Sequence, residues 1–121
     1  MEEYKFRGKR IDNGEWVYGD ICHHDGKVSH IGQHPADGSM LVYDLIPETV
    51  GQYVELKDKN DKEIYEGDIV RFENAGMFYE CRWNPYRVEF AWYYENNYIY
   101  PVGDMRQGLT VIGNIYEQVT P

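Results

Sequence analysis

Short segments of alternating apolar and polar residues, separated by turn residues, dominate this chain and restrict it to an all-β fold. Residues 77–83 place Met, Tyr, Cys and Trp at every second position, and residues 88–94 do the same with Val, Phe, Trp and Tyr. The sequence Asn-Pro-Tyr-Arg at 84–87 predicts a turn between them. Side chains two residues apart lie on one face of a strand. Strands at a spacing of roughly 8–12 residues indicate a sandwich or barrel, and no long amphipathic helix is indicated.

The N-terminal third carries the same kind of signal. Asp12-Asn13-Gly14 predicts a hairpin turn, because Asn and Gly accept positive φ angles. Residues 47–54 are ambiguous, since their apolar residues have helical spacing whereas Gly51 and the β-branched residues favour an extended chain. The strands expected in this part are 4–9, 15–21, 28–31 and 41–43.

The segment KDKNDKEIYEGDIVRF (residues 57–72) has two interpretations: a charged functional site, or a loop and strand start that direct the folding of a small β protein. Gly67 can supply an unusual φ angle, and the Asp68 side chain can accept hydrogen bonds from nearby backbone. We therefore expect the charged run to be an exposed loop and Gly-Asp-Ile-Val to begin a strand. The same Gly-Asx-apolar triplet recurs at 19–21, 103–105 and 113–115, where we expect the glycine to play the same part.

The chain of 121 residues is long enough for one domain with a single core. Its two cysteines, Cys22 and Cys81, are too few for a disulfide framework, so a reducing compartment is expected and a bond between the two is a minor alternative. No signal peptide or membrane-spanning segment is indicated, which predicts a cytoplasmic protein without a membrane partner. The expected core residues are Trp16, Val50, Ile69, Val70, Phe72, Trp83, Phe90, Trp92, Val111 and Ile115.

Two blocks, TVGQYVELKDKNDKEIYEGDIVRF (49–72) and VIGNIYE (111–117), resemble the YopX family, and FRGKRIDNGEWVYGD (6–20) resembles that family's N-terminal element. The resemblance implies a protein of bacterial phages or prophages, and hence the host cytoplasm. It implies a small SH3-like barrel, which we assign to residues 47–121, with an N-terminal β-hairpin and meander (1–46) packed on it in a single domain (1–121). It implies no activity and no catalytic residues.

The aromatic segment at residues 77–100 is the first candidate for a functional surface. One alternating set belongs to the core, and the other set is expected to be exposed. Exposed aromatic side chains rimmed by polar groups are typical of protein contacts. We therefore expect an interaction surface for an unidentified protein or for a second copy of the chain, giving a homo-oligomer. Its residues are Phe78, Tyr86, Tyr93 and Tyr98.

Nucleic-acid binding is the alternative interpretation. Aromatic side chains beside a basic groove form stacking platforms for single strands. However, the formal net charge of −9 repels phosphates and disfavours this partner. Lys5, Arg7 and Lys9 would share one face of the first strand, either as a phosphate-binding stripe or as the solvated face of an edge strand. The residues of this alternative are Lys5, Arg7, Lys9, Arg82 and Arg87.

Metal binding and catalysis have weaker support. Cys22, His24, His30 and His34 are weak candidates for zinc ligands, because zinc takes Cys and His and the last two have H-x₃-H spacing. Neighbouring residues of a strand face opposite ways, so we expect no metal and no other cofactor. Glu63, Glu66 and Asp68 form a carboxylate cluster on a turn that we expect to be exposed. No phosphate loop, nucleophile elbow or H-E-x-x-H motif is present, so we expect no enzyme, and a zinc-dependent enzyme is the remote alternative.

Overall fold

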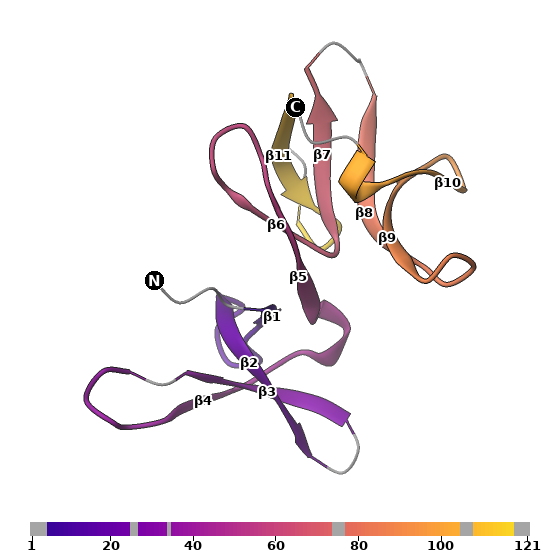
Figure 1. The fold of residues 1–121 in the computed structure, drawn as a ribbon. Helices are drawn as coiled ribbons and strands as arrows, with labels where there is room; N and C mark the ends of the chain where they lie inside the picture. Colours follow the sequence, from indigo (N-terminus) through magenta and orange to yellow (C-terminus); the bar gives the residue numbers. More distant parts are fainter. Residues whose placement is uncertain (1–4, 25–26, 34, 74–76, 105–107, 118–121) are drawn as a thin grey trace. The chain divides into compact units, whose positions relative to one another are not determined.

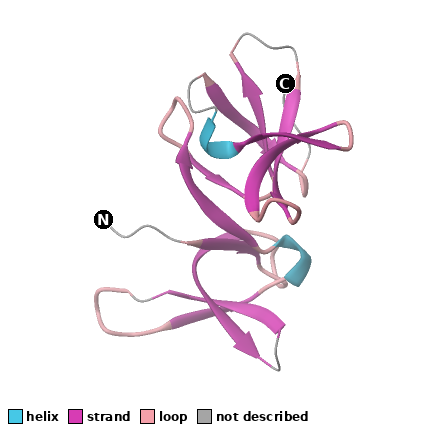
Figure 2. Ribbon diagram, turned by 45° about the vertical axis from the view of Figure 1, so that its right-hand side comes forward, coloured by secondary structure: helices cyan, strands magenta, loops and turns pink. Residues whose placement is uncertain are grey.

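The structure is a computed structural model that describes residues 5–24, 27–33, 35–73, 77–104 and 108–117. Strands dominate these residues, and the helical segments among them are two three-residue 3₁₀ turns (Figure 2). The described strand pairs are antiparallel. The all-β prediction is thereby confirmed. Contacts divide the chain into two compact units, Met1–Tyr53 and Val54–Pro121. The expected single domain of residues 1–121, divided at residue 47, stays a prediction.

The first unit contains a meander of four strands, drawn in indigo to purple in Figure 1. They are four of the six strands of a sheet of the order β4-β3-β2-β1-β5-β6, in which β5 begins in the first unit and ends in the second. Because β1 lies between β2 and β5, the expectation that it is an edge strand was wrong. The bounds are β1 Phe6–Lys9, β2 Trp16–His24, β3 Lys27–Gln33, β4 Leu41–Asp44, the 3₁₀ turn η1 Pro47–Thr49, and β5 Gly51–Lys57.

The chain after β4 returns to the end of β1. The backbone nitrogen of Ile46 donates to the carbonyl of Lys9 at 2.8 Å, and that of Ile11 donates to the carbonyl of Asp44 at 3.1 Å. Close backbone approach also explains Gly19 on β2, because a Cβ there would clash with the carbonyl oxygen of Gly32 on β3. Gly19 thus serves strand packing and not an unusual φ, which corrects the expectation drawn from its Gly-Asp-Ile triplet.

The second unit contains a five-stranded sheet of the order β10-β9-β8-β7-β11. The described strands at its two edges, β10 and β11, do not pair with each other, so this sheet is open and not a closed barrel. Figure 1 shows its strands from magenta through orange to yellow. The bounds are β6 Glu63–Tyr65, β7 Asp68–Phe72, β8 Phe78–Asn84, β9 Glu89–Tyr94, β10 Asn97–Pro101, the 3₁₀ turn η2 Val102–Asp104, and β11 Leu109–Asn114.

The core of the second unit lies on the face of this sheet formed by alternate residues of β7, β8 and β9. Phe72 makes edge-to-face contacts with Tyr79 and Trp92, with ring centroids 4.9 and 5.9 Å apart. Such pairs each add about 0.5–1.5 kcal/mol beyond the burial of their surface. The thiol of Cys81 is buried among them. The buried cluster consists of Ile64, Val70, Phe72, Tyr79, Cys81, Trp92 and Leu109.

The expected core was correct in part. Val70, Phe72 and Trp92 are buried, and Val111 packs half-buried against them. Trp16, Val50, Ile69 and Phe90 are only half-buried. Trp83 and Ile115 are exposed and were wrongly assigned. Trp83 lies near the end of β8, where its ring packs edge-on against Phe90 instead of entering the core. Ile115 follows β11 and lies beyond the last sheet pairing of that strand.

The charged segment 57–72 has a structural role, because two of its carboxylates are buried and accept hydrogen bonds from backbone nitrogens. Asp58 is only 6 % exposed and accepts hydrogen bonds from the nitrogens of Asn60, Lys62 and Val111 at 2.8, 2.9 and 3.0 Å. This fastens the loop to β11. Asp68 accepts from the nitrogen of Tyr65 at 2.8 Å across a turn in which Gly67 has φ +94°. The prediction that Gly-Asp-Ile-Val begins a strand is confirmed, although Asp58 in the loop is not exposed.

Candidate interaction surface

Three of the four aromatic residues expected at an interaction surface lie side by side on β9, β10 and the turn before β9. The strand register places Tyr98 directly opposite Tyr93. Their ring centroids are 5.1 Å apart, and the Tyr86 ring lies 6.4 Å from that of Tyr98. Both pairs have the edge-to-face orientation that aromatic rings prefer. We call Tyr86, Tyr93 and Tyr98 the tyrosine surface.

Arg82 on β8 contacts one ring of the tyrosine surface. Its guanidinium carbon lies 3.7 Å from the centroid of the Tyr93 ring, which is cation–π geometry. Its Nε and Nη2 atoms donate to the two carboxylate oxygens of Glu80 at 3.0 and 2.9 Å. Hydrogen bonding to the Glu80 carboxylate raises the pKa of Arg82 above its usual value. The cation is therefore already paired with a carboxylate, which reduces its capacity to bind a phosphate.

The turn between β8 and β9 projects apolar side chains into solvent. Tyr86 is 87 % exposed and Val88 is 72 % exposed. The turn is fixed at its base, because the buried Asn84 side chain accepts a hydrogen bond from the Tyr86 nitrogen at 3.0 Å. Val88 has φ +55°, a conformation that is strained for a β-branched residue. The expectation that Val88 belongs to the next strand was wrong, because β9 begins at Glu89.

A pocket of about 350 Å³ lies beside this turn. Its wall is residues 98–101 of β10, and Ala91 and Asn84 also line it. Arg87 and Glu89 line it as well and form an ion pair with an Nε–Oε2 distance of 3.7 Å. The pairing register of β10 shifts between Tyr98 and Tyr100, and this irregularity places Tyr98, Ile99 and Tyr100 together along the pocket.

Sequence reasoning found the tyrosines but missed part of their setting. Ile99 and Tyr100 are exposed and line the pocket, and the alternation of the strand gave no sign of the irregularity there. The Glu80-x-Arg82 spacing on one strand face is a signal that could have paired these two residues. Phe78, the fourth expected residue, is 38 % exposed at the start of β8. It lies opposite Arg71 on β7, so the structure places it away from the described ring contacts of the tyrosine surface.

The basic residues of the nucleic-acid alternative are not brought together within one unit. Arg7 is only 5 % exposed, and its guanidinium carbon lies 4.5 Å from the centroid of the Trp16 ring. Lys9 is half-buried with its Nζ atom 5.6 Å from the same ring, whereas Lys5 is exposed. The expected basic stripe is thus a cation–π cluster around a tryptophan, with a buried arginine. Arg82 and Arg87 belong to the other unit and are both paired with glutamates.

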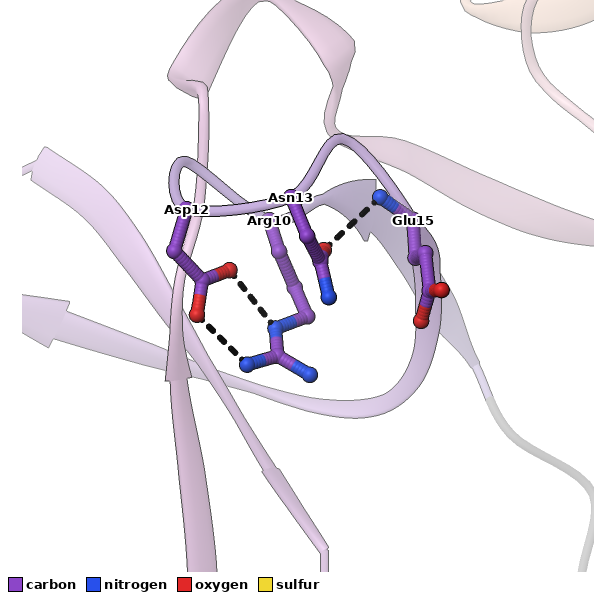
Figure 3. A network of polar contacts seen from close by, with 4 residues as sticks. All are labelled: Arg10, Asp12, Asn13 and Glu15. Carbon is purple, nitrogen blue, oxygen red and sulfur yellow. Dashed lines mark hydrogen bonds and ion pairs between the residues drawn. The ribbon is translucent and has the colours of Figure 1, made fainter.

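A second polar cluster stabilises the hairpin turn of the first unit (Figure 3). Arg10 donates to both carboxylate oxygens of Asp12 at 2.9 and 2.6 Å, and the Asn13 side chain accepts from the Glu15 nitrogen at 2.9 Å. The hydrogen bond from Arg10 lowers the pKa of the exposed Asp12 carboxyl. The Arg10 guanidinium carbon also lies 4.9 Å from the centroid of the Tyr43 ring. These contacts explain the turn by local structure.

The zinc candidates fall largely outside the described side chains. The structure describes the backbone of Cys22 and His24 but not their side chains, and His34 lies outside the described residues. His30 is described: its Nε2 atom lies 2.6 Å from Oδ1 of Asp44 on the neighbouring strand. The register also places Cys22 opposite His30 on β2. Among the described residues no group of three or more metal-ligating side chains occurs. The expectation that the chain binds no metal stays a prediction.

The carboxylate cluster at the turn before β7 was expected to be exposed, and this was wrong for Asp68. Asp68 is 1 % exposed, and its side chain accepts a hydrogen bond from the Tyr65 backbone nitrogen. Glu63 and Glu66 are half-buried, and the hydroxyl of Tyr65 donates to Glu63 at 3.3 Å. The contacts of Asp68 and Glu63 are therefore those of a turn.

No helix among the described residues is long and apolar enough to span a membrane.

These features define the class of the molecule: an antiparallel all-β protein with a surface of three tyrosines, of which Tyr86 is exposed and Tyr93 and Tyr98, both expected to be exposed, are half-buried. The chain belongs to the YopX family, because the family model described as YopX protein matches residues 5–120. Among solved structures, it is similar to protein EF1440 from Enterococcus faecalis, with 21 % sequence identity and a TM-score of 0.59. That match covers 95 % of this chain and 94 % of the other, and it shows a shared fold alone. The comparison with curated proteins gave no match.

Proposed function

We propose that this YopX-family chain is a non-enzymatic interaction module of a phage or prophage, working in the bacterial cytoplasm, that binds another protein through the tyrosine surface. The observation that carries the proposal is the ring chain from Tyr86 through Tyr98 to Tyr93, held in place by Arg82 and Glu80. Rigid aromatic side chains that need not be ordered on binding are typical of interface hot spots. The SH3-like strand arrangement that the family resemblance implies belongs to the same proposal.

Pairing of the local charges favours a protein partner over a nucleic acid. The two arginines beside the tyrosines are matched by Glu80 and Glu89, and the whole chain carries a formal net charge of −9. Stacking platforms for single strands need a basic groove that tracks the phosphates. The tyrosine surface supplies the rings without that groove.

The experiment is affinity capture from the native host lysate, with and without nuclease, read by mass spectrometry. The baits are the parent chain, Tyr98→Ser and the control Tyr43→Ser. Tyr43 is a matched control because it is half-buried, like Tyr98, but belongs to the other unit. Circular dichroism confirms that each bait is folded.

The proposal expects protein partners that survive nuclease, are retained by Tyr43→Ser and are lost with Tyr98→Ser. Loss of every partner on nuclease treatment would support the nucleic-acid alternative instead. Recovery of the same partners by Tyr98→Ser would show that they bind elsewhere and would overturn the proposed surface.

A further inference from the structure

The tyrosine surface carries both a projection and a hollow within one unit. The projection is the β8–β9 turn with its exposed Tyr86 and Val88 side chains. The hollow is the adjacent 350 Å³ pocket along residues 98–101. Its volume lies near the lower end of the range of about 300–1,000 Å³ for ligand sites, which leaves room for a side chain such as tyrosine. A surface with both shapes side by side can fit a copy of itself related by a two-fold axis.

From this geometry we infer that the occupant of the pocket is a second copy of this chain, with Tyr86 of each copy inserted into the pocket of the other. The inference rests on the proposed function and names its partner. Two-fold symmetry makes the contact reciprocal, so each interface contains two Tyr86 insertions. Exposed aromatic residues that fill a partner's pocket are the common form of an interface hot spot.

The charges of the pocket support self-association. Arg87 and Glu89 line the same pocket with opposite charges, 3.7 Å apart. In the inferred dimer, Arg87 of one copy can therefore face Glu89 of the other. The remaining ion pair of the surface, Glu80 with Arg82, is internally neutral. The patch is thus locally neutral on a chain with a net charge of −9, which is what contact between two like-charged copies requires.

The Val88 conformation supplies an independent reason to assign function to the turn. An apolar β-branched residue that is 72 % exposed at φ +55° is unfavourable both for solvation and for backbone energy. Strain of this kind costs of the order of 1–3 kcal/mol and clusters at functional sites. Burial of Val88 against a second copy would account for its apolar side chain.

Salt dependence distinguishes this partner from the others. Two copies with the same net charge repel, and salt screens that repulsion. The apolar burial is not weakened by sodium chloride in the same way, so self-association should strengthen as salt rises. A basic protein or a nucleic acid held by charge should instead bind more weakly.

The first test is sedimentation velocity of the purified chain over a concentration series at 50 and 500 mM sodium chloride. The Debye length is longer than its physiological value of about 8 Å at the lower salt concentration and shorter at the higher one. We expect a monomer–dimer equilibrium that is tighter at high salt. Tyr86→Ser should weaken it by about 10-fold or more, whereas the control Tyr43→Ser leaves it unchanged. Tyr86 is so exposed that its loss should not unfold the chain, which thermal denaturation checks.

The second test separates contacts between copies from contacts within one chain. Arg87→Glu and Glu89→Arg each create a pocket with charges of one sign, so each variant alone should dimerise more weakly than the parent. An equimolar mixture of the two should recover dimers, because an acidic pocket then meets a basic one. Damage within one chain is not repaired by mixing.

The inference is overturned by a monomer at every concentration and salt, by a dimer insensitive to Tyr86→Ser, by a dimer that weakens with salt, or by a mixture no tighter than its components. A monomeric parent that still captures another protein through Tyr98 would overturn the second copy as partner and leave the proposed function intact. Loss of specific capture together with a Tyr86-dependent dimer would restrict the surface to self-association.

Discussion

Arg82 is sandwiched between Glu80 and Tyr93: it binds both carboxylate oxygens of the first and lies 3.7 Å from the ring centroid of the second. The planar guanidinium group makes both contacts at once, which an ammonium group cannot do. This arrangement fixes the Tyr93 ring and, through it, the neighbouring Tyr98 ring. The order of the tyrosine surface therefore depends on a residue that the sequence analysis named only in the alternative of nucleic-acid binding.

Arg82→Lys keeps the charge and removes the planar fork. We expect a loss of about 0.5–1.5 kcal/mol in the free energy of unfolding, measured by urea denaturation, because the Arg82 side chain is partly exposed and its ion pair is screened. Arg87→Lys is the control, since Arg87 makes one longer contact and its side chain is 73 % exposed. Equal effects of the two substitutions would contradict the special role of Arg82.

Asp58→Asn tests the buried carboxylate that fastens the 58–62 loop to β11. An amide retains one acceptor oxygen and turns an amino group toward backbone nitrogens, so some of the three backbone hydrogen bonds must be lost. We expect the free energy of unfolding to fall by about 1–3 kcal/mol. Asp61→Asn, in the same loop, should change it by less than about 0.5 kcal/mol because its side chain is exposed. A neutral Asp58→Asn variant would show that the loop does not depend on this carboxylate.

Val88→Asn tests whether Val88 lowers the stability of the folded chain while strengthening the contact between two copies. Asn tolerates φ +55° better than Val, so the free energy of unfolding of the variant should be about 1 kcal/mol higher than that of the parent. The variant should nevertheless dimerise more weakly, because the apolar side chain is lost. Val88→Ala removes most of the side chain while keeping a residue for which positive φ is unfavourable, so it should weaken dimerisation without that gain. If Val88→Asn is no more stable than the parent, the strain assigned to this residue is absent.

The Asp12 carboxyl should titrate below its usual range, and a carboxyl ¹³C NMR titration measures this directly. The hydrogen bond from Arg10 lowers its pKa in the folded chain, so Arg10→Gln should raise it. The sign of the linkage follows: this contribution to stability is present at neutral pH and is lost as the pH falls through the folded pKa. The pKa of Asp37 is lowered by its hydrogen bond with Ser39 and should not respond to Arg10→Gln. An unchanged Asp12 titration in Arg10→Gln would remove Arg10 as the cause.

The strands could be predicted because period-two alternation and turn residues are local properties of the chain. Asp12-Asn13-Gly14 and the Gly67-Asp68 turn formed where Gly takes a positive φ. Val88 shows the limit of this reasoning, since alternation with Phe90 and Trp92 placed it in a strand that begins one residue later. The departure comes from backbone geometry in the turn, for which the Val side chain gives no signal.

The sequence by itself determined the all-β class, the two alternating faces around residues 77–94, and the family. The tertiary structure decided which charges are available and which aromatic rings meet. Arg7 is buried against Trp16 because β1 lies inside its sheet, and Arg82 meets the Tyr93 ring because β8 pairs with β9. Alternation assigns a side chain to a face, but only the pairing of strands decides which neighbour it meets there. The tyrosine surface and its pocket arise from that pairing.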